Sequence, residues 1–438
     1  MDCLYMNNYR GFTKTILPLK QVNFLVGENS TGKTSVLALL ELLSKPEFWF
    51  TFDFNIGNYE FGGYKDIVSS TTNDPKEYQI GLCKYNHKKK ENDVFYLLHF
   101  RMNLDGLPKL ARFSYLCREY VLTAKFSDKQ FALLVKTDLP KSVDCSQPSD
   151  CFEYMKELAA TQRAGYKIYK DLEKDFTTYF FYRIPIFLSD FFSDKQMKER
   201  IGDMLPYSRF PGLSRSFNSM APIRTTPKRT YDGYTKPFSP EGEHTPYVIR
   251  KELSVSIKQK NEFKKALEVF GKDSGLFKSV GVSQFGNDSA APFELIIVLS
   301  DKPLRINSVG YGVSQVLPVV VQLLTNEKRS WLAIQQPEVH LHPKAQAALG
   351  DVMFHSALQE SQTLFVETHS DYLIDRFRLN MRNQELPSDF AQLVFFERTK
   401  VSNIIHPMVI EDSGEYPEDQ PAEFRNFFLE EHKRILGV

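Results

Sequence analysis

Apolar positions along the chain follow two different periods, and the changes of period predict its elements. Residues 22–26 form a short apolar run that predicts a buried strand, and residues 36–43 predict an apolar helix shortly after it. Residues 331–334 and 363–368 predict two further core strands, each followed by a polar segment. Together these runs predict an α/β core.

The other segments have weaker or different patterns. Residues 77–136 contain short strand-like runs that predict an antiparallel meander. Between 150 and 205 apolar residues recur every three or four positions, which predicts helices. A docked helical arm and a partner-binding arm fit that pattern equally well. We expect a loop over residues 50–70, and a long irregular stretch over residues 206–249, which are rich in Pro, Ser, Thr and Gly.

Composition and charge exclude several classes of protein. The 438 residues are 42% hydrophobic and 25% charged, which is typical of globular chains and not of disordered ones. A net charge of +1 gives no overall electrostatic reason to bind nucleic acid. No apolar run reaches the roughly 18 residues of a membrane span, no secretory pattern opens the chain, and the five cysteines lack zinc spacing. We therefore expect a cytoplasmic protein without membrane contact.

The segment between the first strand and its helix has the sequence GENSTGKTS, which matches the pattern GxxxxGK[ST] in its required strand–loop–helix context. Glycines let successive backbone N–H groups turn toward a phosphate, and the helix N-terminus adds partial positive charge. Lys33 is expected to reach the β- and γ-phosphates, and the Thr34 hydroxyl to bind Mg²⁺. The sequence thus predicts an ATP and Mg²⁺ site made by Asn29, Ser30, Thr31, Gly32, Lys33, Thr34 and Ser35.

A phosphate loop needs an acidic partner at the end of a buried strand. The obvious strand is 331–334, which lies so far along the chain from Lys33 that only a split domain with a large insertion accommodates it. Just upstream, SVGYGVSQVLP opens an apolar helix, and we expect Pro318 in its first turn. The residues that suit a second phosphate contact there, made in the same chain or from a partner protomer, are Gly310, Gly312, Ser314 and Gln315. His369, at the end of the strand 363–368, is well placed to sense a γ-phosphate.

The ordered set GENSTGKTS, SVGYGVSQVLP, IQQPEVHLHP and VETHSD, with the tail EDSGEYPEDQPAEFRNFFLEE, resembles the heads of ABC-type ATPases of the Rad50, SMC and overcoming-lysogenization-defect class. The chain is most similar to the stand-alone AAA-family ATPase subunits of bacterial antiphage systems such as Septu and PARIS. This resemblance makes GYGVSQ the signature motif, His369 the switch histidine and residues 61–63 a candidate Q-loop region.

The resemblance also implies the architecture. We expect an α/β fold of the ABC-ATPase head type, in which a mixed sheet with a P-loop core is joined to an antiparallel β part and an inserted helical arm. Residues 1–75 would form the N-terminal part of the head with Walker A, and 76–149 its antiparallel β part. Residues 150–205 would be the helical insertion, and 206–438 the C-terminal part with the signature, Walker B and the switch histidine.

One part of the motif departs from the relatives. Gln335 stands where they usually carry the Glu or Asp that orders water around Mg²⁺, and Gln336 stands where a hydrolysing enzyme has its glutamate base. A neutral amide cannot accept a proton from water near neutral pH. Glu338 is the nearby acid, either as a cap of the next turn or as a replacement base. The catalytic candidates are therefore Gln335, Gln336, Glu338 and His369, and Gln335 is also the candidate that reaches Mg²⁺ through water.

Two explanations of Gln335 stay open: a natural nucleotide sensor that hydrolyses ATP slowly, or a substitution introduced to trap ATP. His340 and His342 lack a third ligand, so we expect structural roles for them. Ser370 and Asp371 are expected to cap the helix that follows them.

Three functions remain in view. The first is an ATP-binding regulatory subunit that dimerises head-to-head, oligomerises and holds a separate nuclease or toxin effector (HNH or Toprim) in check, with DNA or a phage protein as a candidate trigger. The second is an active DNA-repair-type ATPase acting on DNA ends, which needs a catalytic acid, a basic track and a long coiled coil. The third, a transporter subunit, is disfavoured by the large insertion. We favour the first, with weak or absent hydrolysis. The acidic tail, 411–431, predicts a docked helix and not a nuclease centre, so any nuclease is expected to be a partner.

Overall fold

The computed structural model describes residues 2–56, 60–70, 77–86, 91–117, 120–127, 130–137, 147–160, 165–170, 216–254, 257–286, 288, 290–300 and 302–425. By its internal contacts the chain divides into two compact units. The first unit comprises Met1–Lys20, Glu28–Arg215 and Phe396–Pro407. The second comprises Gln21–Gly27, Ser216–Phe395 and Met408–Val438.

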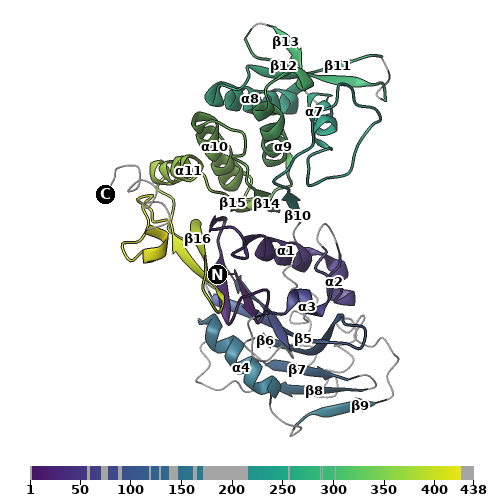
Figure 1. The fold of residues 1–438 in the computed structure, drawn as a ribbon, viewed down its shortest axis with the longest axis vertical. Coiled ribbons are helices and arrows are strands. Elements are labelled where there is room, and N and C mark those ends of the chain that lie inside the picture. Colours follow the sequence, from purple (N-terminus) through teal and green to yellow (C-terminus); the bar gives the residue numbers. More distant parts are fainter. Residues whose placement is uncertain are drawn as a thin grey trace. The chain divides into compact units, whose positions relative to one another are not determined.

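The first unit contains an eight-stranded sheet with the order β2-β1-β4-β5-β6-β7-β8-β9, in which every neighbouring pair is antiparallel (Figure 1). Its strands are β1 (Asp2–Asn7), β2 (Thr15–Leu19), β4 (Tyr78–Asn86), β5 (Glu91–Met102), β6 (Pro108–Cys117), β7 (Val121–Phe126), β8 (Gln130–Lys136) and β9 (Lys167–Lys170). The antiparallel meander predicted for residues 77–136 is confirmed.

The helical prediction for residues 150–205 holds in part. Helix α4 (Pro148–Ala160) covers its beginning. Residues 167–170 are a strand and not a helix, because they pair with β8 at the edge of the sheet. Residues 171–215 lie outside the described residues, and with them the rest of the predicted arm.

Side chains alternate across this sheet and build two different cores. On one face, Phe95 and Leu97 of β5 pack with Phe152 and Met155 of α4. The other face carries Tyr78, Tyr96 and Phe100, whose rings contact an aromatic cluster from residues 48–54. The prediction of a loop over residues 50–70 holds in part. Residues 52–56 and 60–63 are neither helix nor strand, whereas the short helices α2 (Pro46–Thr51) and α3 (Tyr64–Ile67) cover other parts, and Phe52, Phe54, Phe61 and Tyr64 are core residues.

The second unit is built around a six-stranded sheet with the order β10-β14-β15-β3-β16-β17. Its strands are β3 (Val22–Gly27), β10 (Phe217–Met220), β14 (Trp331–Gln335), β15 (Thr363–Glu367), β16 (Ala391–Arg398) and β17 (Asn403–Val409). Strands β10, β14, β15 and β3 are parallel to their neighbours, so their carboxyl ends meet at one edge of the sheet. A separate antiparallel sheet contains β11 (Ser279–Gln284), β12 (Phe293–Val298) and β13 (Pro303–Arg305).

Helices separate these two sheets. They are α7 (Thr245–Ser254), α8 (Ile257–Ser274), α9 (Tyr311–Thr325), α10 (Pro343–Gln359) and α11 (Asp371–Asn383). Figure 1 shows α8, α9 and α10 between the β11–β13 sheet and strands β14 and β15. One continuous apolar core joins α9 and α10 to the residues of β14, β15 and β3 that face them. The predicted α/β class, with a mixed sheet that holds the P-loop core and with an antiparallel β part, is confirmed.

The sequence predicted that Pro318 lies in the first turn of α9, and this prediction is wrong. The helix begins at Tyr311, so Pro318 is inside it and leaves the carbonyl of Ser314 without its usual intrahelical donor. The helix tolerates the proline because its middle is held in the apolar core, from Val313 to Leu323.

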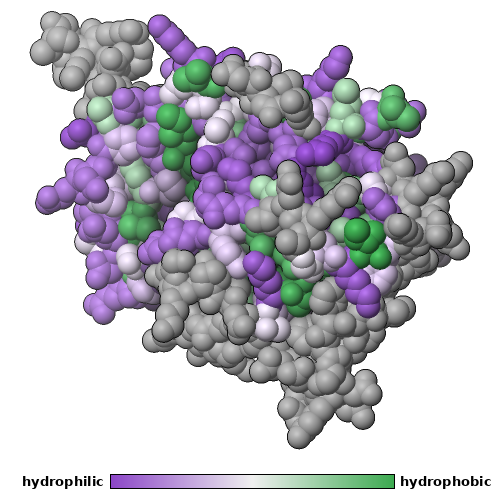
Figure 2. All heavy atoms as spheres, turned by 90° about the horizontal axis from the view of Figure 1, so that it is seen from below, coloured by the Kyte–Doolittle hydropathy of each residue, from purple (hydrophilic) through white to green (hydrophobic). Residues whose placement is uncertain are grey.

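The face of the molecule shown in Figure 2 is mostly hydrophilic where residues are described, with hydrophobic side chains in separate spots. In the described part of the chain, no helix is both long and apolar enough to cross a membrane.

Candidate functional site

The phosphate loop joins β3 to α1 (Lys33–Ser44) and has the backbone that an anion cradle requires. Ser30 and Gly32 have φ values of 63° and 99°, in the left-handed region, so the chain curls before the helix begins. The Thr31 hydroxyl and the Lys33 ammonium both donate to the carbonyl oxygen of Glu28, at 2.8 and 2.7 Å. These bonds hold the loop in its curled form.

Gly32 cannot be replaced without cost. A Cβ built on it would lie 2.5 Å from Cζ of Phe12, which is closer than carbon atoms approach one another. Its φ of 99° would strain any other residue as well. Phe12 is fully buried and packs edge-on against Phe396, so it has little room to move. The structure therefore shows why the motif has glycine here.

The predicted phosphate-binding side chains differ in exposure. Lys33 is only 3% exposed, whereas Asn29, Ser30 and Thr34 are exposed at the loop and at the start of α1. The carbonyl of Ser35 accepts a hydrogen bond from the buried Tyr9 hydroxyl at 3.1 Å, which fixes the first turn of the helix. A loop with this backbone, a lysine and a helix N-terminus fits the phosphates of a nucleotide.

The strand ends of the second unit bring the other candidates together. Gln335 at the end of β14 is in register with Glu367 at the end of β15, and Glu367 is in register with Leu25 of β3. Strand β3 ends at Gly27, and the phosphate loop follows it in the sequence. Parallel strands lie about 4.8 Å apart, so the side chains of Gln335 and Glu367 are neighbours on one face. Glu367 was not among the sequence candidates, although an acid that closes an apolar strand was a visible signal.

The segment that follows β14, residues 335–342, is named here the acid loop. Its residue Gln336 has a φ of 43°, which is unusual for a residue with a side chain, and its N–H donates to the carbonyl of Glu367 at 2.7 Å. The Leu341 N–H closes a turn onto the carbonyl of Glu338 at 3.0 Å. The loop is therefore a tight turn anchored on the neighbouring strand.

One interpretation of the sequence expected Glu338 to cap the next turn. Its side chain does not do so. Its carboxylate accepts hydrogen bonds from the Thr368 hydroxyl at 2.8 Å and from the His369 N–H at 2.7 Å. The N-cap of α10 is instead His342, whose ring accepts from the N–H of Ala345. Glu338 thus ties the acid loop to the end of β15.

His369 and Ser370 follow β15 directly. The His369 side chain is exposed, which suits the sensing role predicted for it, and that role stays a prediction. Ser370 is the N-cap of α11, since its hydroxyl accepts from the Leu373 N–H at 3.1 Å; the capping prediction is confirmed for it. The same hydroxyl donates to Oε1 of Gln346 at 2.6 Å and so links α11 to α10.

The predicted signature residues lie at the start of α9. Gly310 is the N-cap, and a Cβ on Gly312 would come within 2.9 Å of the His340 carbonyl, so this helix start packs closely on the acid loop. The Ser314 hydroxyl donates to the carbonyl of Tyr311 at 2.8 Å, and both Ser314 and Gln315 are buried. Their predicted contact with a second phosphate therefore stays a prediction.

Arg224 is a further residue of this region that sequence reasoning missed. It is 2% exposed, and its Nη2 donates to the main-chain oxygen of Gln335 at 3.0 Å. Burial lowers the pKa of Arg224 to about 10, and the negative charge of Glu338 opposes that shift. A basic residue in an irregular segment gave no sequence signal of this contact.

The described residues contain no group of three His, Cys, Asp or Glu side chains that could hold a metal ion. His340 instead packs edge-on against Tyr311, with ring centres 4.7 Å apart. Mg²⁺ commonly keeps its waters and binds through one or two protein oxygens plus phosphates. The exposed hydroxyl of Thr34 is of the type that suits such a shell. The predicted roles of Thr34 and Gln335 toward Mg²⁺ stay predictions.

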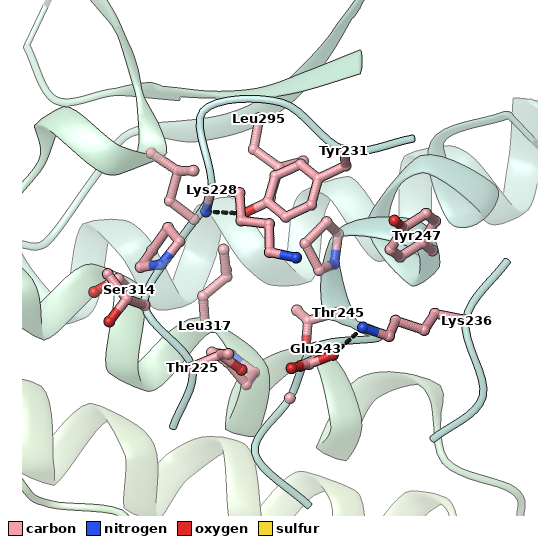
Figure 3. Close-up of a pocket in the computed structure, with 16 residues that line it drawn as sticks. Thr225, Lys228, Tyr231, Lys236, Glu243, Thr245, Tyr247, Leu295, Ser314 and Leu317 are labelled. Atoms are coloured by element: carbon pink, nitrogen blue, oxygen red, sulfur yellow. Dashed lines mark hydrogen bonds and ion pairs between the residues drawn. The ribbon is translucent and has the colours of Figure 1, made fainter. Parts of the chain in front are cut away.

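A cavity of about 50 Å³ borders α9 on the side of residues 225–247. Figure 3 shows Ser314 and Leu317 on one wall and Lys228, Tyr231 and Thr245 around it. The Lys228 N–H donates to the Tyr231 hydroxyl at 3.0 Å, and Lys236 forms an ion pair with Glu243. Ligand pockets usually measure about 300–1,000 Å³, so this cavity is too small for a nucleotide.

Comparison with known proteins gives two family matches. The family described as "AAA domain, putative AbiEii toxin, Type IV TA system" matches residues 155–375, and the family described as "AAA ATPase domain" matches residues 1–203. No curated protein matches the chain.

Several solved structures share low similarity with the chain. An Smc head bound to the C-winged helix domain of ScpA is 10% identical, with a TM-score of 0.43, and covers 94% of this chain and 98% of its own. The SMC head domain from Thermotoga maritima is 8% identical, with a TM-score of 0.39 and coverages of 92% and 97%. An Smc head with an extended coiled coil, bound to the C-terminal domain of ScpA derived from Pyrococcus furiosus, is 11% identical, with a TM-score of 0.39 and coverages of 99% and 100%.

The phosphate loop, the parallel strands beside it and the family matches agree. Family membership implies nucleotide binding, typically with Mg²⁺, and the loop geometry fits it. Because the first match spans half of the chain, the chain belongs to the family of AAA domains described as "AAA domain, putative AbiEii toxin, Type IV TA system".

Proposed function

We propose that this chain binds ATP with Mg²⁺ and releases phosphate slowly. The observation that carries the proposal is a contrast at one edge of the parallel sheet. The phosphate loop after β3 has its glycine, lysine and curled backbone in place, whereas β14 ends in two amides, Gln335 and Gln336. A site of this kind retains the groups that bind phosphate and carries amides at the two positions where a hydrolysing enzyme of the resembled class has its acids.

The chemistry of each residue follows from its type. Lys33 binds the β- and γ-phosphates as a point charge, and the Thr34 hydroxyl and Gln335 complete the Mg²⁺ shell, Gln335 through water. Gln336 cannot take a proton from the attacking water, because an amide is not basic. Glu338 could, but both of its oxygens already accept hydrogen bonds from the end of β15. Turnover is therefore slow.

The proposal extends to assembly. Two copies associate head-to-head, and the start of α9 in one copy, with Gly312 and Ser314, completes the ATP site of the other. The exposed Tyr311 and Gly310 at that helix start support this, because they present its N-terminal dipole to the surroundings. Further contacts between such dimers then build higher oligomers.

We further propose that the ATP-bound assembly restrains a separate effector, a nuclease of the HNH or Toprim class or another toxin, in antiphage defence. Support comes from the resemblance of the ordered motifs to the ATPase subunits of Septu and PARIS. The family description, which names a toxin and a Type IV TA system, is compatible with a role beside a partner protein. DNA or a phage protein would act as the trigger.

The experiment is a titration of the purified chain with a fluorescent ATP analogue in the presence of Mg²⁺. Lys33→Ala removes the phosphate-loop cation and is expected to abolish binding. Lys45→Ala is the matched control, since Lys45 flanks the other end of α1, where it pairs with the buried Glu41.

Sedimentation of the same samples reports association. The unmodified chain is expected to dimerise with saturating ATP, and Lys33→Ala to remain monomeric. An ATP affinity of Lys33→Ala equal to that of Lys45→Ala would refute the proposed binding site. A monomer at micromolar protein and saturating ATP would refute the assembly.

A further inference from the structure

Arg224 lies in the irregular segment that follows β10 and reaches the end of the neighbouring strand β14. Its guanidinium makes one hydrogen bond, from Nη2 to the main-chain oxygen of Gln335. Among the described residues, its Nε and Nη1 have no hydrogen-bond partner, although the side chain is only 2% exposed.

A buried positive charge needs a negative one nearby, and Glu338 provides it. The negative charge of Glu338 raises the pKa of Arg224 and so opposes the effect of burial. The two carboxylate oxygens of Glu338 accept hydrogen bonds from the Thr368 hydroxyl and the His369 N–H. Glu338 is thus held by hydrogen bonds from the end of β15 and attracted by the charge of Arg224. The end of β15 and the segment that follows β10 set its position.

Arg224 also contacts the start of α9. Its main-chain oxygen accepts from the side-chain amide of Gln315 at 3.4 Å, and Gln315 is buried. The residue therefore links two segments that the proposed function uses, the helix start with the signature residues and the acid loop.

We propose that Arg224 is a positioning residue for the acid loop: its hydrogen bond to Gln335 and its charge opposite Glu338 fix where Gln336 and Glu338 lie. The inference rests on the proposed function, because it assigns Arg224 to the turnover of bound ATP and not to ATP binding. A displacement of about 1 Å in such a loop costs up to about 100-fold in rate.

The chain offers a matched control for this role. Arg250 in α7 is also buried, and its Nη2 donates to the carbonyls of Gly233 and Tyr234 at 2.6 Å. Its guanidinium packs over the ring of Phe293, 4.2 Å from its centre. These contacts hold an irregular segment to a helix, so Arg250 exemplifies a buried arginine whose role is structural.

The test uses full-length protein in excess over radiolabelled ATP, with phosphate release followed for hours and ATP affinity measured by titration. Arg224→Met is expected to bind ATP as the unmodified chain does and to release phosphate about 100-fold more slowly. Arg224→Lys keeps the charge and one donor, and is expected to recover part of the rate. Arg250→Met is expected to change neither quantity, although it lowers the thermal midpoint.

A double-mutant cycle identifies the partner. In the Glu338→Gln background, Arg224→Met is expected to cause a smaller further loss, because the charge of Glu338 is gone and only the hydrogen bond to the main-chain oxygen of Gln335 remains to be removed. Equal losses in both backgrounds, an unchanged rate in Arg224→Met, or the same rate loss in Arg250→Met would each overturn the inference while ATP binding stands. An unmodified chain that binds no ATP would overturn the proposed function instead.

Discussion

The phosphate loop follows strand β3 and the acid loop follows strand β14, yet the two loops are held in different ways. The phosphate loop is shaped by its own sequence: Gly32 supplies the left-handed backbone, and Thr31 and Lys33 bond to Glu28 a few residues away. The acid loop is shaped by distant residues. Gln336 adopts a positive φ without being glycine, and it is held by the carbonyl of Glu367.

Because of this difference, we expect ATP binding and ATP turnover to respond to changes in different parts of the chain. A loop stabilised by local bonds keeps its shape whatever happens elsewhere, so phosphate binding is expected to be robust. A loop held by Thr368, His369 and Arg224 changes shape when any of these moves. Regulation of turnover is therefore expected to act on the acid loop and not on the phosphate loop.

The largest effect is expected from Gly32→Ala. The new Cβ would meet Phe12, and the φ of 99° would strain the residue, so ATP binding should be lost and the free energy of unfolding should fall by about 1–3 kcal/mol. Titration with ATP and chemical denaturation measure the two effects. Gly106→Ala is the control, because Gly106 has a φ of 79° but nothing within 4 Å of its Cβ position.

Comparison of the two glycine variants isolates the effect of the phosphate loop's shape on ATP binding. Both carry backbone strain, and only Gly32→Ala carries the clash and alters the cradle. If Gly32→Ala bound ATP as well as Gly106→Ala does, the view that local backbone geometry makes the phosphate site would be wrong.

A smaller effect is expected from Gln335→Glu, which restores a carboxylate at the end of β14. Groups that order a metal through water usually change activity or metal affinity by about 10–100-fold, so phosphate release should rise by that factor and saturate at lower Mg²⁺. Gln336→Glu is the matched control. Alone it should raise phosphate release little, because Gln335 would still order the water around Mg²⁺ poorly. A greater rise in Gln336→Glu than in Gln335→Glu would contradict the assignment of Gln335 to the metal shell.

The contrast between segments held by local bonds and segments held by distant residues explains which features the sequence could predict. Strands β3, β14 and β15 and helix α1 were predicted because each follows from an apolar run and a local pattern. The antiparallel strands between residues 77 and 136 were predicted for the same reason. Signals confined to neighbouring residues are those that sequence patterns carry.

Features that depend on distant partners escaped prediction. Arg224 contacts a residue 111 positions away, and no pattern around it announces that bond. Strand β9 is a strand because β8 offers it an edge, not because of its own residues. Within the predicted loop, 50–70, the burial of Phe52 and Phe54 was missed, since these side chains pack against a sheet that later segments form.

The smallest effect is expected from Ser370→Ala, at the cap of α11. The hydroxyl accepts from the Leu373 N–H and donates to Gln346, so its loss should lower the free energy of unfolding by about 1 kcal/mol. Urea denaturation of the two proteins measures the difference. Ser370→Thr retains a hydroxyl that can make both bonds and should stay close to the unmodified chain. ATP affinity should not change in either variant, because the cap supports the segment after His369 and not the phosphate loop. A loss in Ser370→Thr as large as in Ser370→Ala would show that packing at this position, and not the cap, stabilises the end of β15 to which the acid loop is tied.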